Sequence, residues 1–157
     1  MAPEELHQVV VITLGGKALA FPVETVREVV PLVEPTPVPA WPDTALGVIE
    51  IRGELVPLLD VTSVLDLAPS VLSAQQFIVV VEVLGKVWGI VVDRIEDVRH
   101  GAVRAVNDVG PAALNDATLC VGVITEGDDS IVVLDPEQVI RASGIAAAAT
   151  TQVEPPR

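Results

Sequence analysis

The sequence predicts an all-β protein, mainly β with short helices, made from two copies of one small unit. Hydrophobic residues make up 50% of the 157 residues, but Tyr is absent and Phe and Trp occur only twice each. Val, Ile and Leu must therefore fill the core, and a Val-rich composition favours strands. Short apolar runs alternate with turn residues, which is typical of barrels and sandwiches. The second half of the chain also repeats the pattern of the first.

The chain opens with a predicted hairpin. Gln8–Leu14 and Lys17–Pro22 are its strands, because Gly15-Gly16 between them supplies the positive φ of a tight turn. Val26–Val30 follows as a third strand. Residues 31–43 contain five prolines and are expected to form an extended surface loop, since proline donates no ladder hydrogen bond.

The middle of the chain predicts two more strands on either side of Arg52-Gly53 and a short helix at about residues 61–67. After a polar connector, Phe77–Leu84 and Val87–Asp93 form a second predicted hairpin. Asp135–Ile140 has Asp at the N-cap and Pro at the first helical position, so a capped helical turn is expected there.

Two stretches align between the halves of the chain. Val23–Val30 aligns with Val92–Arg99, and the pair Gly47 and Asp60 aligns with Gly122 and Asp135, with the same spacing between Gly and Asp in each pair. Units of this size are marginally stable alone. We therefore expect the two copies to pack together and share a core.

Charge and cysteine content exclude several classes of partner. The formal net charge of −13 disfavours binding to nucleic acid and to anionic lipid. No uninterrupted apolar run approaches the roughly 18 residues of a spanning helix, so no membrane insertion is expected. The single cysteine, Cys120, cannot form an internal disulfide, and no secretory signal opens the chain. A cytoplasmic location is the expectation.

The sequence predicts no catalytic residue, no metal site and no cofactor. His7 and His100 are the only histidines, and neither has a cysteine or acidic residue at ligand spacing. Cys120 lies in an apolar run, where cysteine usually acts as a small buried hydrophobe. Phosphate-binding loops, serine elbows and dinucleotide fingerprints are absent from the sequence.

Two motifs carry a resemblance to a known family. Residues 47–60 read Gly-Val-Ile-Glu-Ile-Arg-Gly-Glu-Leu-Val-Pro-Leu-Leu-Asp, and residues 87–98 read Val-Trp-Gly-Ile-Val-Val-Asp-Arg-Ile-Glu-Asp-Val. The first is similar to the signature Gly-Val-x-x-Leu-Arg-Gly-x-x-Val-Pro-x-x-Asp-Leu of the CheW-like family of chemotaxis coupling proteins. The second is similar to the hallmark of that family's second half.

The resemblance implies two SH3-like five-stranded β-barrels packed together within residues 8–142. The first barrel is expected at about residues 8–67 and the second at about 76–142, with exchange of strands between them possible. Residues 1–7 and 143–157 are expected as flexible termini.

The resemblance also implies a non-enzymatic scaffold. Its partners would be the regulatory domain of a CheA-type histidine kinase and the cytoplasmic tip of a chemoreceptor. A small-molecule-binding or catalytic β-barrel is the alternative. The sequence does not identify the pathway, which could serve swimming, pilus motility or another chemotaxis-like system.

The resemblance points to two docking surfaces. Kinase binding is expected near Pro37, Val38 and Leu46. The receptor groove is expected to include Val26, Val29 and Val98, although strand alternation would place about half of such valines in the core. Thr44 stands where the family usually has an aromatic residue, and Trp41 precedes the proline instead.

Arg52 is expected to form an ion pair across neighbouring strands with Glu28, the nearest partner that is consistent with the family resemblance. A guanidinium at a strand end offers a planar fork for a carboxylate. The pair would either order a docking surface or remain an exposed pair with little effect on stability. The sequence leaves both interpretations open.

Overall fold

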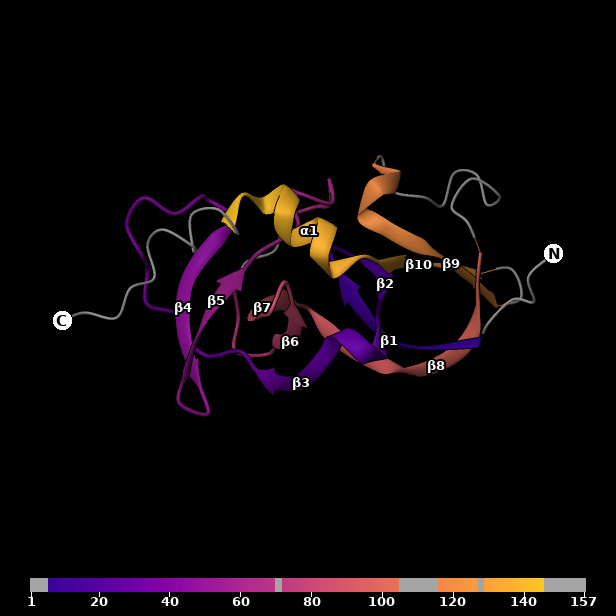
Figure 1. The fold of residues 1–157 in the computed structure, drawn as a ribbon, viewed down its shortest axis with the longest axis horizontal. Helices are drawn as coiled ribbons and strands as arrows, with labels where there is room; N and C mark the ends of the chain where they lie inside the picture. Colours follow the sequence, from indigo (N-terminus) through magenta and orange to yellow (C-terminus); the bar gives the residue numbers. More distant parts are fainter. Residues whose placement is uncertain (1–5, 70–71, 105–115, 127–128, 146–157) are drawn as a thin grey trace.

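The computed structural model describes residues 6–69, 72–104, 116–126 and 129–145, and the fold in these ranges is mainly β, as predicted (Figure 1). A short helix, α1, follows the last strand, and single 3-10 turns precede β3 and β9. The elements are β1 Leu6–Leu14, β2 Lys17–Pro22, η1 Val23–Thr25, β3 Val26–Pro31, β4 Ala45–Ile51, β5 Glu54–Leu59, β6 Phe77–Val83, β7 Lys86–Val92, β8 Arg94–Arg104, η4 Ala117–Leu119, β9 Cys120–Glu126, β10 Asp129–Leu134 and α1 Pro136–Ser143.

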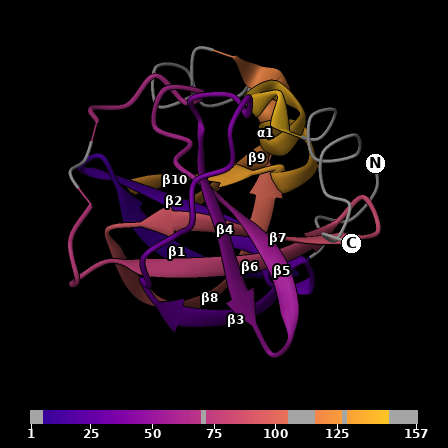
Figure 2. The ribbon, with the colours of Figure 1, turned by 90° about the vertical axis from the view of Figure 1, so that its left-hand side faces the viewer.

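The strands form two five-stranded sheets. One closes into a barrel in the order β1-β2-β10-β9-β8, which we call barrel A. The other, sheet B, has the order β3-β6-β7-β5-β4. In Figure 1 barrel A lies on the right and sheet B on the left; Figure 2 shows sheet B with the β4–β5 hairpin in front of β6 and β7.

The two sheets exchange their first hairpins. Hairpin β1–β2 lies with β8, β9 and β10, whereas hairpin β6–β7 lies with β3, β4 and β5. The predicted spans 8–67 and 76–142 are therefore wrong as separate barrels, because each supplies strands to both sheets. Strand exchange, foreseen as a possibility, is the arrangement that the structure has. Both halves are needed to complete either sheet.

Each exchanged hairpin joins its sheet through an antiparallel ladder on one side, β1 with β8 or β6 with β3, and through a short parallel ladder on the other. In barrel A, Leu19 and Ala20 of β2 pair with Val132 and Val133 of β10. In sheet B, residues 58–59 of β5 pair with residues 89–90 of β7. The two ladders occupy equivalent places in the two sheets, so the duplication seen in the sequence is also a duplication of topology.

The aligned glycines, Gly47 and Gly122, have the same structural role in the two sheets. Each follows a register shift that leaves one extra residue in its strand, Leu46 in β4 and Val121 in β9. A Cβ on Gly47 would lie 2.2 Å from the Thr36 carbonyl oxygen, and one on Gly122 would lie 2.3 Å from the Arg104 carbonyl oxygen. Glycine is therefore required at both bulges by a close backbone approach.

The hairpins turn through residue pairs that have positive φ. Gly15-Gly16, Arg52-Gly53 and Leu84-Gly85 have φ values of 58° and 78°, 51° and 82°, and 58° and 71°. Two successive left-handed residues are typical of the tight turns that match the twist of paired strands. The glycine at the second position is the shared sequence signal.

Three apolar clusters fill the molecule. One draws on all five strands of barrel A and another on all five strands of sheet B. The largest, which we call the common core, joins residues of both sheets to α1 and includes Phe21, Trp88 and Ile140. The expected sharing of a core is confirmed, and α1 lies across the top of the two sheets in Figure 1.

Residues 61–67 form a single turn and not the predicted helix. Leu67 N donates to Thr62 O at 2.8 Å and Asp66 N donates to Ser63 O at 3.3 Å, while Asp66 has a φ of 55°. This pattern is a Schellman motif, which ends a helix after its first turn. At α1 the prediction is confirmed: Asp135 Oδ1 accepts from Glu137 N at 3.1 Å.

The predicted flexible termini begin too far inside the chain. Leu6 and His7 belong to β1, where they pair with residues 102 and 101 of β8. Ser143 and Ile145 are buried, because the end of α1 packs into the common core. Residues 1–5 and 146–157 lie outside the described ranges. Within those ranges, no helix is long and apolar enough to cross a membrane.

The exchange of hairpins predicts that neither half folds alone. If the chain is cut in the connector between residues 69 and 76, each half should lack the β-sheet circular dichroism of the whole protein, because its strands belong to two incomplete sheets. An equimolar mixture should regain that signal. A single half that folds alone into a stable barrel would contradict this topology.

Candidate functional site

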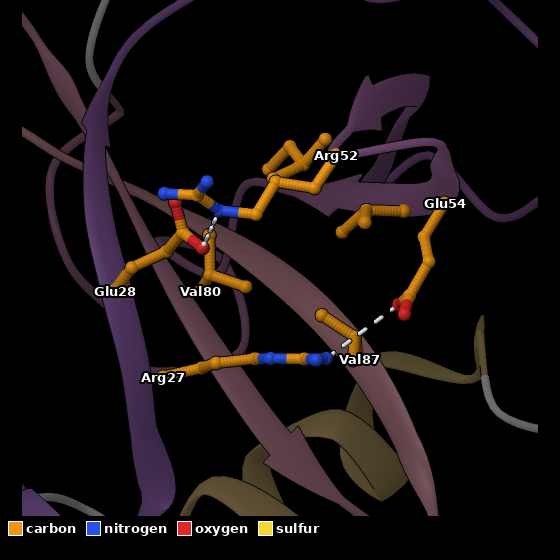
Figure 3. A pocket seen from close by; sticks show the side chains of 8 residues that line it. Arg27, Glu28, Arg52, Glu54, Val80 and Val87 are labelled. Atoms are coloured by element: carbon orange, nitrogen blue, oxygen red, sulfur yellow. Dashed lines mark hydrogen bonds and ion pairs between the residues drawn. The ribbon is translucent and has the colours of Figure 1, made fainter.

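Two ion pairs connect the opposite edges of sheet B. Arg52 Nε lies 2.9 Å from Glu28 Oε2, and Arg27 Nη1 lies 3.6 Å from Glu54 Oε2. Arg27 and Glu28 come from edge strand β3, whereas Arg52 and Glu54 come from the β4–β5 hairpin at the other edge (Figure 3). We call these four residues the edge cluster. The predicted Arg52–Glu28 contact is present, but it joins two sheet edges and not neighbouring strands.

A β-bulge directs both β3 side chains to the same gap. The pairing of β3 with β6 shifts between Val26 and Glu28, so Arg27 is an extra residue. Bulges change the direction of side chains that would otherwise alternate between the two faces. As a result Arg27 and Glu28, although adjacent in sequence, both reach the β4–β5 hairpin.

Arg52 owes its position to the hairpin turn. It is the first turn residue, with a φ of 51°, and its side chain is 78% exposed whereas that of Glu28 is 21% exposed. The hydrogen bond to Glu28 and the negative charge of this carboxylate raise the pKa of Arg52 above its ordinary value. Arginine is charged at physiological pH in any case, and most of this side chain remains exposed at the surface.

The space beneath the edge cluster is small. Ile51, Val56, Val80 and Val87 line it together with the four charged residues, and its volume is about 20 Å³. This volume holds about one water molecule, whereas pockets for small molecules measure roughly 300–1,000 Å³. The edge cluster is therefore a surface feature and not a metabolite pocket.

The predicted kinase residues Pro37 and Val38 belong to the proline segment, residues 31–43, and Leu46 lies in the adjoining strand β4. Thr36 in this segment pairs with Val48 of β4, with N–O distances of 2.9 and 2.8 Å, so the segment is fixed along the outer edge of sheet B. Pro37 is exposed, but Val38 packs partly against the common core and Leu46 against the core of sheet B. Of the three, Pro37 is the most accessible to a partner.

The predicted receptor valines divide into two kinds. Val26 is half-buried and packs against the common core, while Val29 and Val98 are 37% and 55% exposed. Val29 lies on β3 of sheet B and Val98 on β8 of barrel A. Val98 is the counterpart of Val29 in the alignment of the two halves. The two exposed valines therefore occupy equivalent positions on the two sheets.

The unusual Trp41 is a core residue. It is buried in the common core, and its indole Nε1 has no hydrogen-bond partner among the described residues. Thr44 Oγ1 donates to Ser143 O at 2.9 Å and so attaches the end of the proline segment to α1. Thr44, which departs from the family pattern, thus contacts the helix.

The described residues include no group of three or more His, Cys, Asp or Glu side chains that could hold a metal ion. His100 is exposed, and its Nε2 lies 2.8 Å from Gln8 Nε2. Cys120 is partly buried against the common core, in agreement with its predicted apolar role.

Sequence reasoning missed the second ion pair and the exposed Leu55. Leu55 lies on β5 beside Glu54 and is one of the exposed large hydrophobic residues. The available signal was the charge order: Arg27 precedes Glu28, and Arg52 precedes Glu54, so each segment offers one cation and one anion to the other. The bulge at Arg27, which makes both contacts possible, had no such signal.

Comparison with known proteins identifies the family. The CheW-like domain profile matches residues 8–144, which is most of the chain. The chain belongs to the CheW-like family. It is 30% identical over 92 residues to the probable chemotaxis protein CheW of Rhizobium etli, a match that covers 59% of this chain and 59% of that relative. The match thus spans less than two thirds of the relative.

Other CheW-like proteins match over more of their length. The chemotaxis protein CheW of Helicobacter pylori is 22% identical over 138 residues, which cover 88% of this chain and 84% of the relative. The crystal structure of the scaffolding protein TtCheW from Thermoanaerobacter tengcongensis superimposes with a TM-score of 0.74 at 24% identity, covering 83% of this chain and 90% of that one. At this identity the likeness concerns the fold.

Gly47→Ala should detach the proline segment from β4, because the new Cβ would overlap the Thr36 carbonyl. We expect a loss of about 1–3 kcal/mol in the free energy of unfolding, which chemical denaturation measures. Gly53→Ala is the matched control: Gly53 also has positive φ, but an added methyl group there would meet no atom within 4 Å. It should cost only the backbone strain, about 1 kcal/mol. Equal losses in the two variants would contradict a steric role for Gly47.

Proposed function

We propose that this protein is a non-catalytic adaptor that joins a chemoreceptor to a CheA-type histidine kinase in chemotaxis or a chemotaxis-like pathway. Membership of the CheW-like family supports this proposal, as do the names of the relatives. The observation that carries it is the edge cluster, where the family signature places a charged, exposed Arg52 over a cavity too small for a metabolite. On this proposal the protein works in the cytoplasm, needs no cofactor, and acts by presenting docking surfaces to its two partners.

The kinase regulatory domain is proposed to dock on the outer edge of sheet B. Pro37 is exposed there, and Leu46 lies at the bulge in the adjoining strand. Thr36 and Val48 hold the proline segment against β4 before any partner arrives. A surface that is already ordered loses less conformational entropy on binding, which favours affinity.

The receptor tip is proposed to contact Val29 and Val98. These valines are exposed at equivalent positions of β3 and β8, one on each sheet, and both strands run along the lower side of the molecule in Figure 1. A helical tip with an apolar stripe would cover both. Val26, which packs against the common core, would support this surface from below.

Arg52→Asn tests whether the edge cluster orders a docking surface. Asparagine tolerates the left-handed turn conformation, so the variant removes the ion pair without adding backbone strain. We expect an almost unchanged melting temperature and weaker capture of the kinase regulatory domain or of the receptor tip in a pull-down. Arg94→Asn is the control, because Arg94 forms a similarly exposed ion pair with Glu96 at 3.2 Å on barrel A. A folded Arg52→Asn variant that captures both partners normally would leave the pair without a binding role.

Val98→Glu tests the receptor surface. The side chain is 55% exposed, so the substitution should not affect folding, but the charge should abolish capture of an isolated receptor tip fragment while kinase capture remains. Val121→Glu, at a position that is 49% exposed on β9, is the matched control and should bind both partners. Loss of receptor capture in both variants, or in neither, would contradict the proposed surface.

A further inference from the structure

A single residue joins the two sheets at one of their connections. The chain passes from β2 of barrel A to β3 of sheet B through Val23–Thr25, and from β7 of sheet B to β8 of barrel A through Asp93 alone. Asp93 therefore lies at a joint where rotation about its two soft backbone dihedrals would change the relation between the sheets.

The Asp93 carboxylate accepts a hydrogen bond from each of the two sheets at this joint. Its Oδ2 accepts from Gly15 N at 2.9 Å, in the β1–β2 turn of barrel A. Its Oδ1 accepts from Gln76 Nε2 at 2.9 Å, at the start of β6 in sheet B. The Asp93 backbone N–H also donates to Thr13 O of β1 at 2.9 Å. Both oxygens are thus used, one for each sheet.

Gln76 is held so that only its NH₂ group can reach Asp93. It is 5% exposed, and its Oε1 accepts from Ser73 N at 2.8 Å. Its backbone carbonyl oxygen accepts from Leu32 N at 3.0 Å, just beyond the end of β3. Through Gln76, Asp93 is therefore connected by hydrogen bonds to Ser73, before β6, and to Leu32, after β3.

We propose that Asp93 and Gln76 form a clamp that sets the orientation of barrel A relative to sheet B, and that Asp93 is a positioning residue for the adaptor. The common core between the sheets consists of apolar side chains, whose attraction has no direction. Charge-assisted hydrogen bonds are directional and strong when partly buried. The clamp therefore adds a directional constraint to the apolar contact between the sheets.

The consequence for function rests on the proposed adaptor role. The kinase is proposed to bind sheet B, whereas the receptor tip is proposed to contact Val29 of sheet B and Val98 of barrel A together, so receptor capture depends on the relation of the two sheets. Loss of the clamp should then leave kinase binding unchanged, weaken receptor capture and uncouple receptor control from kinase activity. A residue that served stability alone would not separate kinase binding from receptor capture.

A pair of substitutions breaks and restores the clamp. Asp93→Asn leaves one acceptor oxygen for two donors, so either Gly15 N or Gln76 Nε2 loses its partner. Adding Gln76→Glu restores the pattern: the new carboxylate accepts from Ser73 N and from the new amide NH₂, while the oxygen of that amide accepts from Gly15 N. The double variant keeps the net charge of the native protein. Glu24→Gln is the control, since Glu24 is exposed and is the counterpart of Asp93 in the alignment of the two halves.

The orientation is measured with spin labels on full-length protein. Labels replace the exposed Glu82 of β6 and Thr125 of β9, one on each sheet, in a Cys120→Ala background. The protein with the native clamp and the Glu24→Gln variant should each give one narrow distribution of the distance between the two labels. Asp93→Asn should broaden it, because losing one charge-assisted hydrogen bond raises the ratio of open to clamped molecules about tenfold to a hundredfold. Asp93→Asn with Gln76→Glu should restore the narrow distribution.

A narrow, unchanged distribution in folded Asp93→Asn would overturn the clamp, as would failure of the double variant to restore it. If Asp93→Asn does not fold, Gln76→Met, which keeps the Gly15 contact, replaces it with the same expected broadening. Assays of kinase activity in the presence of receptor are a separate experiment. Failure of the native protein to bind a kinase would refute the proposed function, while the distance measurement would still decide the clamp.

Discussion

The structure depends on the reciprocal exchange of two hairpins, each held in its sheet by a short parallel ladder on one side and an antiparallel ladder on the other. Leu19–Ala20 with Val132–Val133 completes barrel A, and Leu58–Leu59 with Gly89–Ile90 completes sheet B. Each ladder joins strands from different halves of the chain, and the common core joins residues of the two completed sheets. Neither sheet is therefore an independent unit. The protein is one body that carries two similar faces.

This arrangement of strands explains how a chain without identified reactive groups could function as a scaffold. The exchange places the equivalent strands β3 and β8 on two different sheets, so each exposes a valine at the same repeat position. The edge cluster connects the edges of sheet B where the ladder is incomplete, and the proline segment covers the outer side of β4. Asp93 then holds the two sheets at one joint. A scaffold requires accessible surfaces that are held in a fixed orientation to one another. These features together provide such surfaces.

Much of the fold could be predicted because its signals are local. Alternating apolar runs, the glycine turns and the Asp135-Pro136 cap identify β1, β2, β7 and α1 within a few residues. The assignment of strands to sheets could not be predicted, because the local signals define each hairpin but not the strands with which it pairs. The Arg52–Glu28 contact followed from the family pattern. The Arg27 bulge and the Asp93–Gln76 contact depend on segments that meet only after the sheets assemble.

Native-state hydrogen exchange on the amides of β2 and β7 tests the central claim most directly, because each of these exchanged strands has a paired strand on both sides, β2 in barrel A and β7 in sheet B. If the exchanged hairpins make one cooperative body, the slowest amides of both strands open with the same free energy, equal to that of global unfolding from denaturant titration. Two separate values, with one sheet opening while the other stays protected, would contradict the account.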